Sequence, residues 1–230
     1  MRPRVQALLL WLIGLVILRI SLADLYLRFV RPVMRPYLIA AGAFLVLLGF
    51  ANLLLDHDDE HDHDGHRHRS RAGWLLLAPV TVLVLVLPPA LGAGAAAHSR
   101  PPAFPEGSAD LPALPVGRPV PVTFLGYVRR ATEAPATLTG RTLRLEGFVT
   151  PRRAGGYYLT RMVITCCAAD AAAVRIAVLG PRAGGYPANT WLQITGQFVP
   201  GTDGDPDQLI TRLQAASVRR VRPPHNPYDH

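Results

Sequence analysis

Apolar residues form three long runs in the N-terminal part of the chain and alternate with polar residues in the C-terminal part. The runs cover residues 5–22, 37–55 and 74–91. A helix needs about 20 apolar residues to cross the roughly 30 Å hydrocarbon core of a bilayer, and each run comes near that length. The pattern therefore predicts three transmembrane helices, two of them within residues 1–55 and the third over residues 74–91.

The first run is the least regular of the three, because it contains Arg19 and is preceded by Arg2 and Arg4. It reaches a spanning length only if Arg19 snorkels towards a head group. The competing interpretation is a secretory signal, cleaved near the small residues Ser21 and Ala23. The arginine just before that site and the second apolar run soon after it favour an uncleaved helix.

The second run carries no charged residue. The small residues at which another helix could approach it closely are Ala41, Gly42 and Gly49. Before it, residues 24–36 hold three arginines among aromatic residues, namely Arg28, Arg31 and Arg35. That composition is typical of a short connector at the membrane interface, so we expect the first two helices to be joined at the bilayer surface.

Beyond the third run, residues 92–115 are rich in Ala, Gly and Pro and predict a semi-extended linker. Residues 116–230 then show the period-two alternation of strands, after a short helix within residues 120–130. The predicted strands are residues 142–149, 157–167, 174–179 and 191–199, with a last one within residues 209–221. Gly147 and Gly196 fall late in their strands and indicate a strongly bent sheet. The predicted fold class is therefore membrane α plus β: three N-terminal transmembrane helices and a small β-rich, OB-like barrel domain.

The formal charge of +8 comes entirely from arginine, since the chain has no lysine. Residues 116–230 hold fourteen arginines against seven acidic residues, but few aromatic residues accompany them. Sites for single-stranded nucleic acid interleave basic and aromatic side chains, so we expect no nucleic-acid partner. No phosphate-binding glycine loop, Ser/His/Asp set or pair of catalytic carboxylates stands out, and we predict that the protein is not an enzyme.

The distribution of arginines also predicts an orientation. Arg2 and Arg4 on the short N-terminal tail favour a cytoplasmic N-terminus. Three helices then place the loop before residue 74 in the cytoplasm and the C-terminal domain outside it. We expect a multi-pass protein of the bacterial plasma membrane, with the lipid bilayer as one of its partners.

Residues 56–73 form a polar loop between the second and third runs, and histidine and aspartate dominate it. Imidazole and carboxylate groups are ligands for divalent transition metals, with Zn²⁺ the expected ion. The candidate metal ligands are His57, His61, His63, His66 and His68, with Asp58, Asp62 and Asp64. Such redundant ligands suit a site that collects and releases a metal, with an affinity that falls as pH drops through the histidine pKa near 6.5. The alternative is a solvated loop that binds metal only under purification conditions.

The chain contains two cysteines, and they are adjacent in the sequence. On a strand, Cys166 and Cys167 would point to opposite faces, one thiol in the core and the other exposed near Arg161, where a thiolate is favoured. They are a second candidate metal or redox site, to which Asp170 could add a carboxylate. The alternative is a buried cysteine beside an incidental one, with Asp170 beginning a turn.

The segments LEGFV, YLTRMVITCCAADA, VRIAV and WLQITGQF, together with the spans and the histidine loop, resemble the YcgQ-like bacterial membrane proteins. The most specific part is residues 161–171, with the double cysteine followed by Ala-Ala-Asp-Ala. The resemblance implies a permease subunit, partnered with a larger polytopic permease of the YraQ/YcgR type. It also implies a connection with zinc supply.

The sequence thus predicts an accessory subunit of a two-component membrane permease that binds a divalent transition metal, with no catalytic or cofactor-binding residues. One alternative is a membrane-tethered thiol oxidoreductase that uses Cys166 and Cys167. The other is a non-catalytic anchor or assembly factor.

Overall fold

The computed structural model divides the chain into two compact units, Met1–Pro89 and Ala90–His230. The residues that the structure describes are 3–55, 89–100, 111–115, 117, 119–152, 155–180, 185–203 and 210–229. The histidine loop and residues 74–88 of the third apolar run lie outside them.

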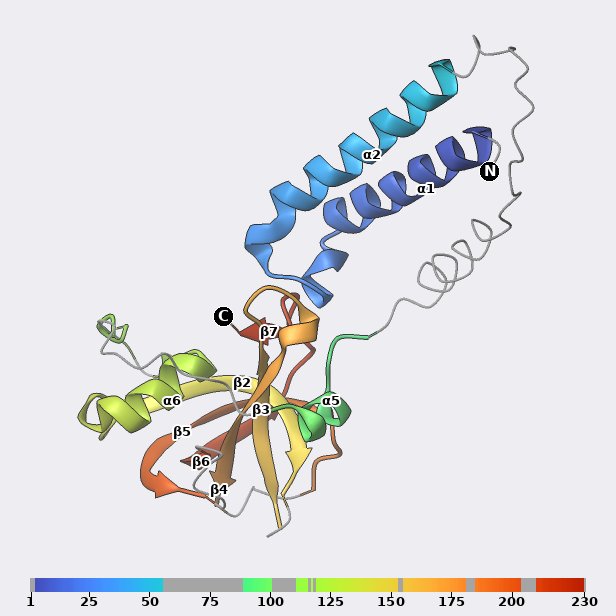
Figure 1. Ribbon diagram of the computed structural model, residues 1–230. Helices are drawn as coiled ribbons and strands as arrows, with labels where there is room; N and C mark the ends of the chain where they lie inside the picture. Colours follow the sequence, from blue (N-terminus) through green and yellow to red (C-terminus); the bar gives the residue numbers. More distant parts are fainter. Residues whose placement is uncertain are drawn as a thin grey trace. The chain divides into compact units, whose positions relative to one another are not determined.

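The first unit is a pair of helices, α1 (Pro3–Leu22) and α2 (Arg35–Leu55), which lie side by side (Figure 1). Two short 3-10 turns join them, η1 (Leu25–Arg28) and η2 (Pro32–Met34). The helices approach so closely that a Cβ atom on Gly14 would lie 2.8 Å from the carbonyl oxygen of Gly42. A Cβ atom on Gly49 would lie 2.9 Å from the carbonyl oxygen of Ala7. The expectation that Gly42 and Gly49 allow close helix packing is therefore confirmed.

The predicted three transmembrane helices are not what the described residues contain. There, one helix is long and apolar enough to cross a membrane, and it covers the 23 residues Pro32–Leu54. In α1 the apolar helix is the shorter segment Gln6–Leu22. The prediction accepted the first run on the condition that Arg19 snorkels, but the apolar helix there is shorter than the roughly 20 residues that a bilayer requires. The predicted fold class with three transmembrane helices is therefore wrong, and the multi-pass topology built on it is not supported.

The second unit is built around a closed β-barrel of five strands (Figure 1). The ring strands are β2 (Thr142–Pro151), β3 (Tyr157–Val163), β4 (Ala172–Leu179), β5 (Trp191–Thr202) and β6 (Thr211–Arg220). Their order around the ring is β2-β5-β6-β4-β3, and pairing of β3 with β2 closes it. The β4–β6 pair is parallel, and the other ring pairs are antiparallel.

Two short strands lie outside the ring, and the predicted fold class did not include them. Strand β1 (Val120–Pro121) pairs with β2, and β7 (Tyr228–Asp229) pairs with β3, both in parallel. The pairing of β7 ties the C-terminal part of the chain to the strand that precedes the two cysteines.

Alternation along the strands places one set of side chains inside the barrel. The interior residues Leu143, Leu145, Leu159, Ile176 and Ile194 are at most 1% exposed. Helix α6 (Phe124–Glu133) packs against this core through Phe124, Tyr127 and Val128. The Thr123 hydroxyl accepts a hydrogen bond from the amide of Gly126 and so caps the start of the helix.

Two glycines let strands of the barrel approach where a side chain would collide. A Cβ atom on Gly147 would lie 2.6 Å from the carbonyl oxygen of Thr160, and one on Gly196 would meet the carbonyl oxygen of Gln214. The pairing of β5 with β6 also shifts register between Thr195 and Gly196. The predicted role of these glycines in a bent sheet agrees with both observations.

The segment before the barrel is partly folded, whereas the sequence predicted a linker over residues 92–115. Residues Ala93–His98 form the helix α5, in which Ala96 is fully buried. The amide of Ala93 donates to the Asn189 side chain at 2.6 Å, and the amide of Ala173 donates to the Ser99 hydroxyl at 3.1 Å. The packing against the barrel stabilises this short helix, which its composition alone does not predict.

Candidate metal centre

The two cysteines lie in a loop that follows β3. The sequence predicted a strand continuing to Cys167, but β3 ends at Val163 and the 3-10 turn η4 (Ala168–Asp170) begins just after the cysteines. Ile164 still faces the interior, at 2% exposed, and its amide donates to the carbonyl oxygen of Asp229. Strand β3 thus ends where its pairing with β7 ends.

The carboxylate of Asp170 organises this loop. Its Oδ1 accepts a hydrogen bond from the amide of Thr165 at 2.7 Å. Its Oδ2 accepts from the amides of Cys166 at 2.7 Å and Cys167 at 3.2 Å. Three successive amides therefore point at one side chain, which explains why the strand geometry is lost at this position. In this arrangement Cys167 occupies the cap position of η4 and Asp170 its third residue.

The same fold brings three ligand-type atoms together. The sulfurs of Cys166 and Cys167 and a carboxylate oxygen of Asp170 all lie within 4.8 Å of one another. Within the described residues this is the group of His, Cys, Asp or Glu side chains whose spacing could hold a metal ion. Both cysteines are free thiols. Cys166 is exposed and Cys167 is half-buried, so the loop presents the cluster to solvent.

Two details predicted for the cysteines are wrong. Neither thiol is buried in the core, because the residues are in a loop and not on a strand. Arg161 is also not a partner that favours a thiolate. Its guanidinium donates to the carbonyl oxygens of Glu146 at 3.2 Å and Asn226 at 2.9 Å, and it lies 5.0 Å from the ring centroid of Trp191. Burial lowers the pKa of Arg161, in part against the charges of Asp229 and Glu146.

The thiol and the carboxylate perturb each other in opposite directions. The Cys166 thiol donates to the Asp170 carboxylate and also hydrogen-bonds Cys167, and these bonds raise the pKa of Cys166 to about 11. Desolvation raises the pKa of Asp170, but the hydrogen bonds from Cys166 and the amides of Thr165, Cys166 and Cys167 outweigh it and lower this pKa to about 2. At neutral pH the cluster therefore holds a protonated Cys166 beside an ionised carboxylate.

The remaining predicted ligands lie outside the described residues. They are His57, His61, His63, His66 and His68, with Asp58, Asp62 and Asp64. Of the predicted metal ligands, the described structure brings together Cys166 and Cys167, and it adds Asp170. The sequence signal for Asp170 was its position three residues after the second cysteine, but only the loop geometry shows that all three amides converge on it.

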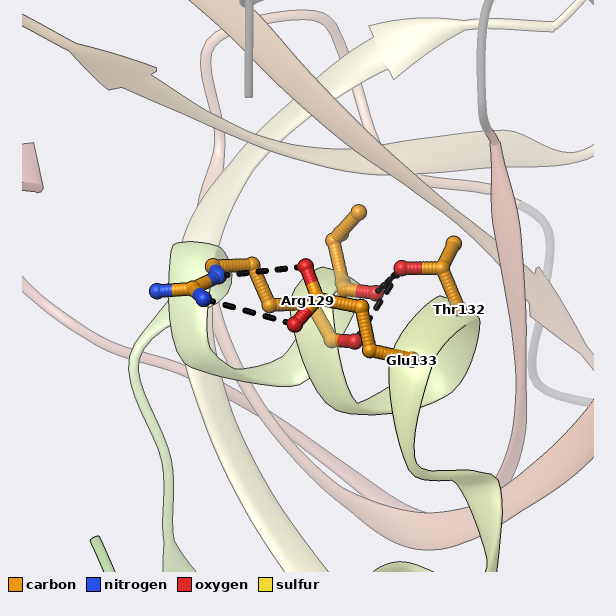
Figure 2. Close-up of polar contacts among 4 residues, drawn as sticks. Arg129, Thr132 and Glu133 are labelled. Carbon is orange, nitrogen blue, oxygen red and sulfur yellow. Dashed lines mark hydrogen bonds and ion pairs between the residues drawn. The ribbon is translucent and has the colours of Figure 1, made fainter. Parts of the chain in front are cut away.

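A groove beside helix α6 is a second feature of the barrel domain that could hold a ligand. It has a volume of about 410 Å³ and lies between residues 111–115 and α6. Two arginines line it, but both are engaged. Arg129 is paired with Glu133, with Nη2 and Oε2 3.3 Å apart, and Thr132 hydrogen-bonds within the same helix (Figure 2). Arg130 donates to the carbonyl oxygen of Pro112 at 2.5 Å. The Arg130 bond holds residues 111–115 to the helix, the other bonds lie within α6, and we assign the groove no ligand.

The described site is thus a thiol–carboxylate cluster on an exposed loop of a small β-barrel. Residues 122–229 match the family model described as the DUF1980 C-terminal domain. The match begins just before α6 and ends in β7, so it contains the whole ring and the cluster. It spans slightly less than half of the chain. No curated protein and no solved structure matches the chain.

Proposed function

We propose that this protein is a membrane-anchored, non-enzymatic accessory protein whose barrel binds a divalent transition metal, Zn²⁺ first among them. The observation that carries the proposal is the approach of the Cys166 and Cys167 sulfurs and an Asp170 oxygen to within 4.8 Å of one another. Thiolate and carboxylate are both ligands that Zn²⁺ accepts. Their exposure lets an ion enter and leave without unfolding of the barrel.

The spacing of the three atoms is close to what one ion requires. Two sulfurs bound to a tetrahedral Zn²⁺ at about 2.3 Å each lie roughly 3.8 Å apart. The loop therefore needs to close by about an ångström at most. Three protein ligands leave the fourth position of the ion open. An open position suits transfer of the ion to another protein better than a permanent structural role.

The hydrogen bonds of Asp170 indicate how the ion is accepted. An ionised carboxylate offers about four acceptor positions, and the three amides with the Cys166 thiol occupy them. The amides keep the carboxylate in place, while the proton of the Cys166 thiol occupies the acceptor position that a cation can take. Binding then releases a proton from each thiol that coordinates, so affinity rises with pH.

Membrane anchoring rests on the helix pair. The 23-residue segment Pro32–Leu54 can cross a bilayer by its length and composition, and only 11% of its apolar window is buried inside the protein. A core helix of a soluble protein would be mostly buried, whereas here Phe44 and Leu47 are 61% and 66% exposed. The close packing of α1 along α2 through Gly14 and Gly42 supports an α1 that is retained and not cleaved as a signal.

The histidine loop and a partner complete the proposal. The histidines and aspartates of residues 57–68 collect the ion near the bilayer, and the barrel cluster receives it or passes it on. The resemblance to YcgQ-like proteins supports a polytopic permease as the partner. A single anchoring helix does not build a translocation pathway alone, which also supports a separate subunit for transport.

The thiol oxidoreductase is the alternative that the geometry favours less. The attacking species in thiol–disulfide exchange is the thiolate, and the pKa of Cys166 is raised. The same protonated thiol is compatible with metal binding, because a cation itself displaces the proton.

Calorimetric titration of the full chain in detergent with Zn²⁺ at pH 7 tests the proposal. We expect a site that disappears in the Cys166→Ser/Cys167→Ser variant and weakens in Asp170→Asn. Glu133→Gln removes a carboxylate of α6 that is not part of the cluster and is the matched control, expected to bind like the parent. Replacing the five loop histidines by alanine is expected to remove additional, weaker sites only. Equal Zn²⁺ binding by the parent and the double cysteine variant would show that the barrel cluster is not the site.

A further inference from the structure

The connector between α1 and α2 reverses the chain over a few residues. Asp24 adopts a left-handed conformation, with φ 57°, directly after the end of α1. This backbone geometry stops a helix and turns the chain back. The Asp24 carboxylate then pairs with Arg35 at the start of α2, with Oδ1 and Nη1 3.4 Å apart. The ion pair joins the two ends of the connector, and Tyr26 and Leu27 within the connector are buried.

The charge of this connector is strongly positive. It holds Arg28, Arg31 and Arg35 against the single acidic residue Asp24, which is the only acidic residue in the first 55 positions. Arg28 is exposed, and the side chain of Arg35 is 43% exposed although it is paired. At the other end of α2 the sequence becomes acidic, beginning with Asp56. The basic connector before α2 therefore attracts anions, whereas the acidic sequence after α2 attracts cations.

Exposed apolar side chains lie close to these arginines in the sequence. Leu22, Val33 and Tyr37 are 65%, 58% and 68% exposed. The segment able to cross a membrane begins at Pro32, within the connector itself. An exposed tyrosine near the start of a membrane-spanning helix, such as Tyr37, is typical of the boundary between hydrocarbon and head groups. If α2 crosses the bilayer, the guanidinium groups lie at the level of the lipid phosphates.

We propose that the arginines of the α1–α2 connector form a binding site for the head groups of anionic phospholipids. The inference rests on the membrane anchoring in the proposed function. A guanidinium presents a planar fork of donors that matches phosphate oxygens, and three of them cluster here against one carboxylate. A lipid is favoured over a free phosphate because its acyl chains cover the exposed Leu22 and Val33 while its head group meets the arginines.

Native mass spectrometry of the full chain in detergent tests the site. The chain is titrated with phosphatidylglycerol and, separately, with phosphatidylcholine of the same acyl chains. Each basic residue near an anionic surface contributes on the order of 1 kcal/mol, which is roughly fivefold in affinity. We expect phosphatidylglycerol to bind the parent at least tenfold more tightly. That preference is expected to fall towards unity in Arg28→Gln/Arg31→Gln/Arg35→Gln and to weaken without disappearing when the three arginines become lysine, which keeps the charge and loses the planar fork.

The matched control removes the same charge from the barrel, as Arg141→Gln/Arg144→Gln/Arg222→Gln, and is expected to keep the preference. Equal binding of the two lipids by the parent, or loss of preference in the barrel variant alone, would overturn the inference. Displacement of phosphatidylglycerol by millimolar inorganic phosphate would also overturn it, in favour of a free-phosphate site. Carbonate extraction of cell membranes separates this outcome from failure of the anchor: a chain that stays in the membrane but lacks a lipid preference contradicts only the head-group site.

Discussion

The helix pair and the barrel use apolar residues in opposite ways. In the barrel, Leu145 and Leu159 point inward and are at most 1% exposed. In α2, Leu47 and Leu54 are 66% and 60% exposed although they are the same residue type. All the large hydrophobic side chains that the described structure leaves exposed belong to the helix pair and its connector.

This difference shows that the two units are adapted to different surroundings. A β-barrel in water gains stability by removing apolar surface from solvent, at roughly 25 cal/mol per Å². The helix pair cannot do so through its own fold, because the two helices contact each other through small residues such as Gly14 and Gly42. The apolar outer face of the helix pair is the observation behind the proposed membrane anchor, because lipid would cover such a uniformly apolar surface.

The largest expected effect follows from truncation of the same residue type in each unit. Leu159→Ala leaves a cavity in the barrel core and is expected to lower the free energy of unfolding by about 2–5 kcal/mol. Leu47→Ala, at an exposed site of α2, is expected to change barrel unfolding by less than about 0.5 kcal/mol. Urea unfolding of the full chain in detergent, followed by circular dichroism of the barrel, measures both. Similar losses would contradict the difference in burial.

A charge placed on the outer face of α2 tests the other half of the comparison. Leu47→Arg lies near the middle of the spanning segment, where an arginine costs about 2.5–3.5 kcal/mol. We expect this variant to be partly extracted from membranes by carbonate, whereas the parent resists. Gln197→Arg, at an exposed position of β5, is the control and should behave like the parent. Full retention of Leu47→Arg would argue against a lipid-facing surface.

The barrel glycines extend the comparison, because they lie where neighbouring strands are too close to leave room for a side chain. Gly147→Ala forces a methyl group against the carbonyl oxygen of Thr160 and is expected to destabilise the barrel by about 1–3 kcal/mol. Gly94→Ala, in α5, has open space around the added atom and is expected to be neutral or slightly stabilising. Thermal unfolding of both variants distinguishes them. Equal shifts would mean that the close approach at Gly147 is not tight in solution.

The smallest effect concerns the loop that carries the cluster. The raised pKa of Cys166 keeps its thiol protonated, so alkylation should increase with pH up to about 11. Removal of the acceptor charge in Asp170→Asn lowers this pKa and should speed alkylation of Cys166 at pH 8. Two pKa units correspond to about a hundredfold change in thiolate, but solvent screens an exposed pair, and we expect roughly tenfold. Peptide mass spectrometry after timed iodoacetamide treatment measures it, with Glu133→Gln as the control. An unchanged alkylation rate would show that the Asp170 carboxylate does not raise the pKa of the Cys166 thiol.

The contributions of Asp170 and Cys166 to folding stability change with pH in opposite directions. The pKa of Asp170 is lowered to about 2, so its bonds stabilise the folded loop above its ordinary pKa near 4. That contribution is lost as pH falls from about 4 to about 2. The opposite holds for Cys166, whose raised pKa gives a contribution present below about 9 and lost as pH rises through about 11.

Strands were the features that the sequence predicted most directly. Alternation located residues 142–149, 174–179 and 191–199, and the structure has β2, β4 and β5 at these positions with slightly longer ends. Period-two patterns are visible because each residue of a barrel strand faces either the core or the solvent. The helix α5 was missed because contacts with the barrel, and not its Ala/Gly composition, stabilise it.

The candidate site was predictable in its residues and not in its geometry. Adjacent cysteines and a nearby aspartate can be read from the sequence, but the β-branched residues Val163, Ile164 and Thr165 before them favour a strand that continues to Cys166. This pattern does not indicate that the strand ends at Val163. The strand does not resume after Ile164 because the Asp170 carboxylate, three to five residues on, accepts hydrogen bonds from the amides of residues 165–167, a local competition between a side chain and the sheet. The predicted number of membrane-spanning helices was wrong because the length of each apolar helix decides whether it can cross a bilayer.

The most direct test of the metal centre is the absorption spectrum of the full chain with Co²⁺, which replaces Zn²⁺ at thiolate sites and reports its ligands. We predict a thiolate-to-cobalt charge-transfer band in the near ultraviolet at pH 8, absent in Cys166→Ser/Cys167→Ser and weaker at pH 6. The band should disappear on addition of Zn²⁺. A chain whose cobalt spectrum is the same with and without the two cysteines would contradict the account.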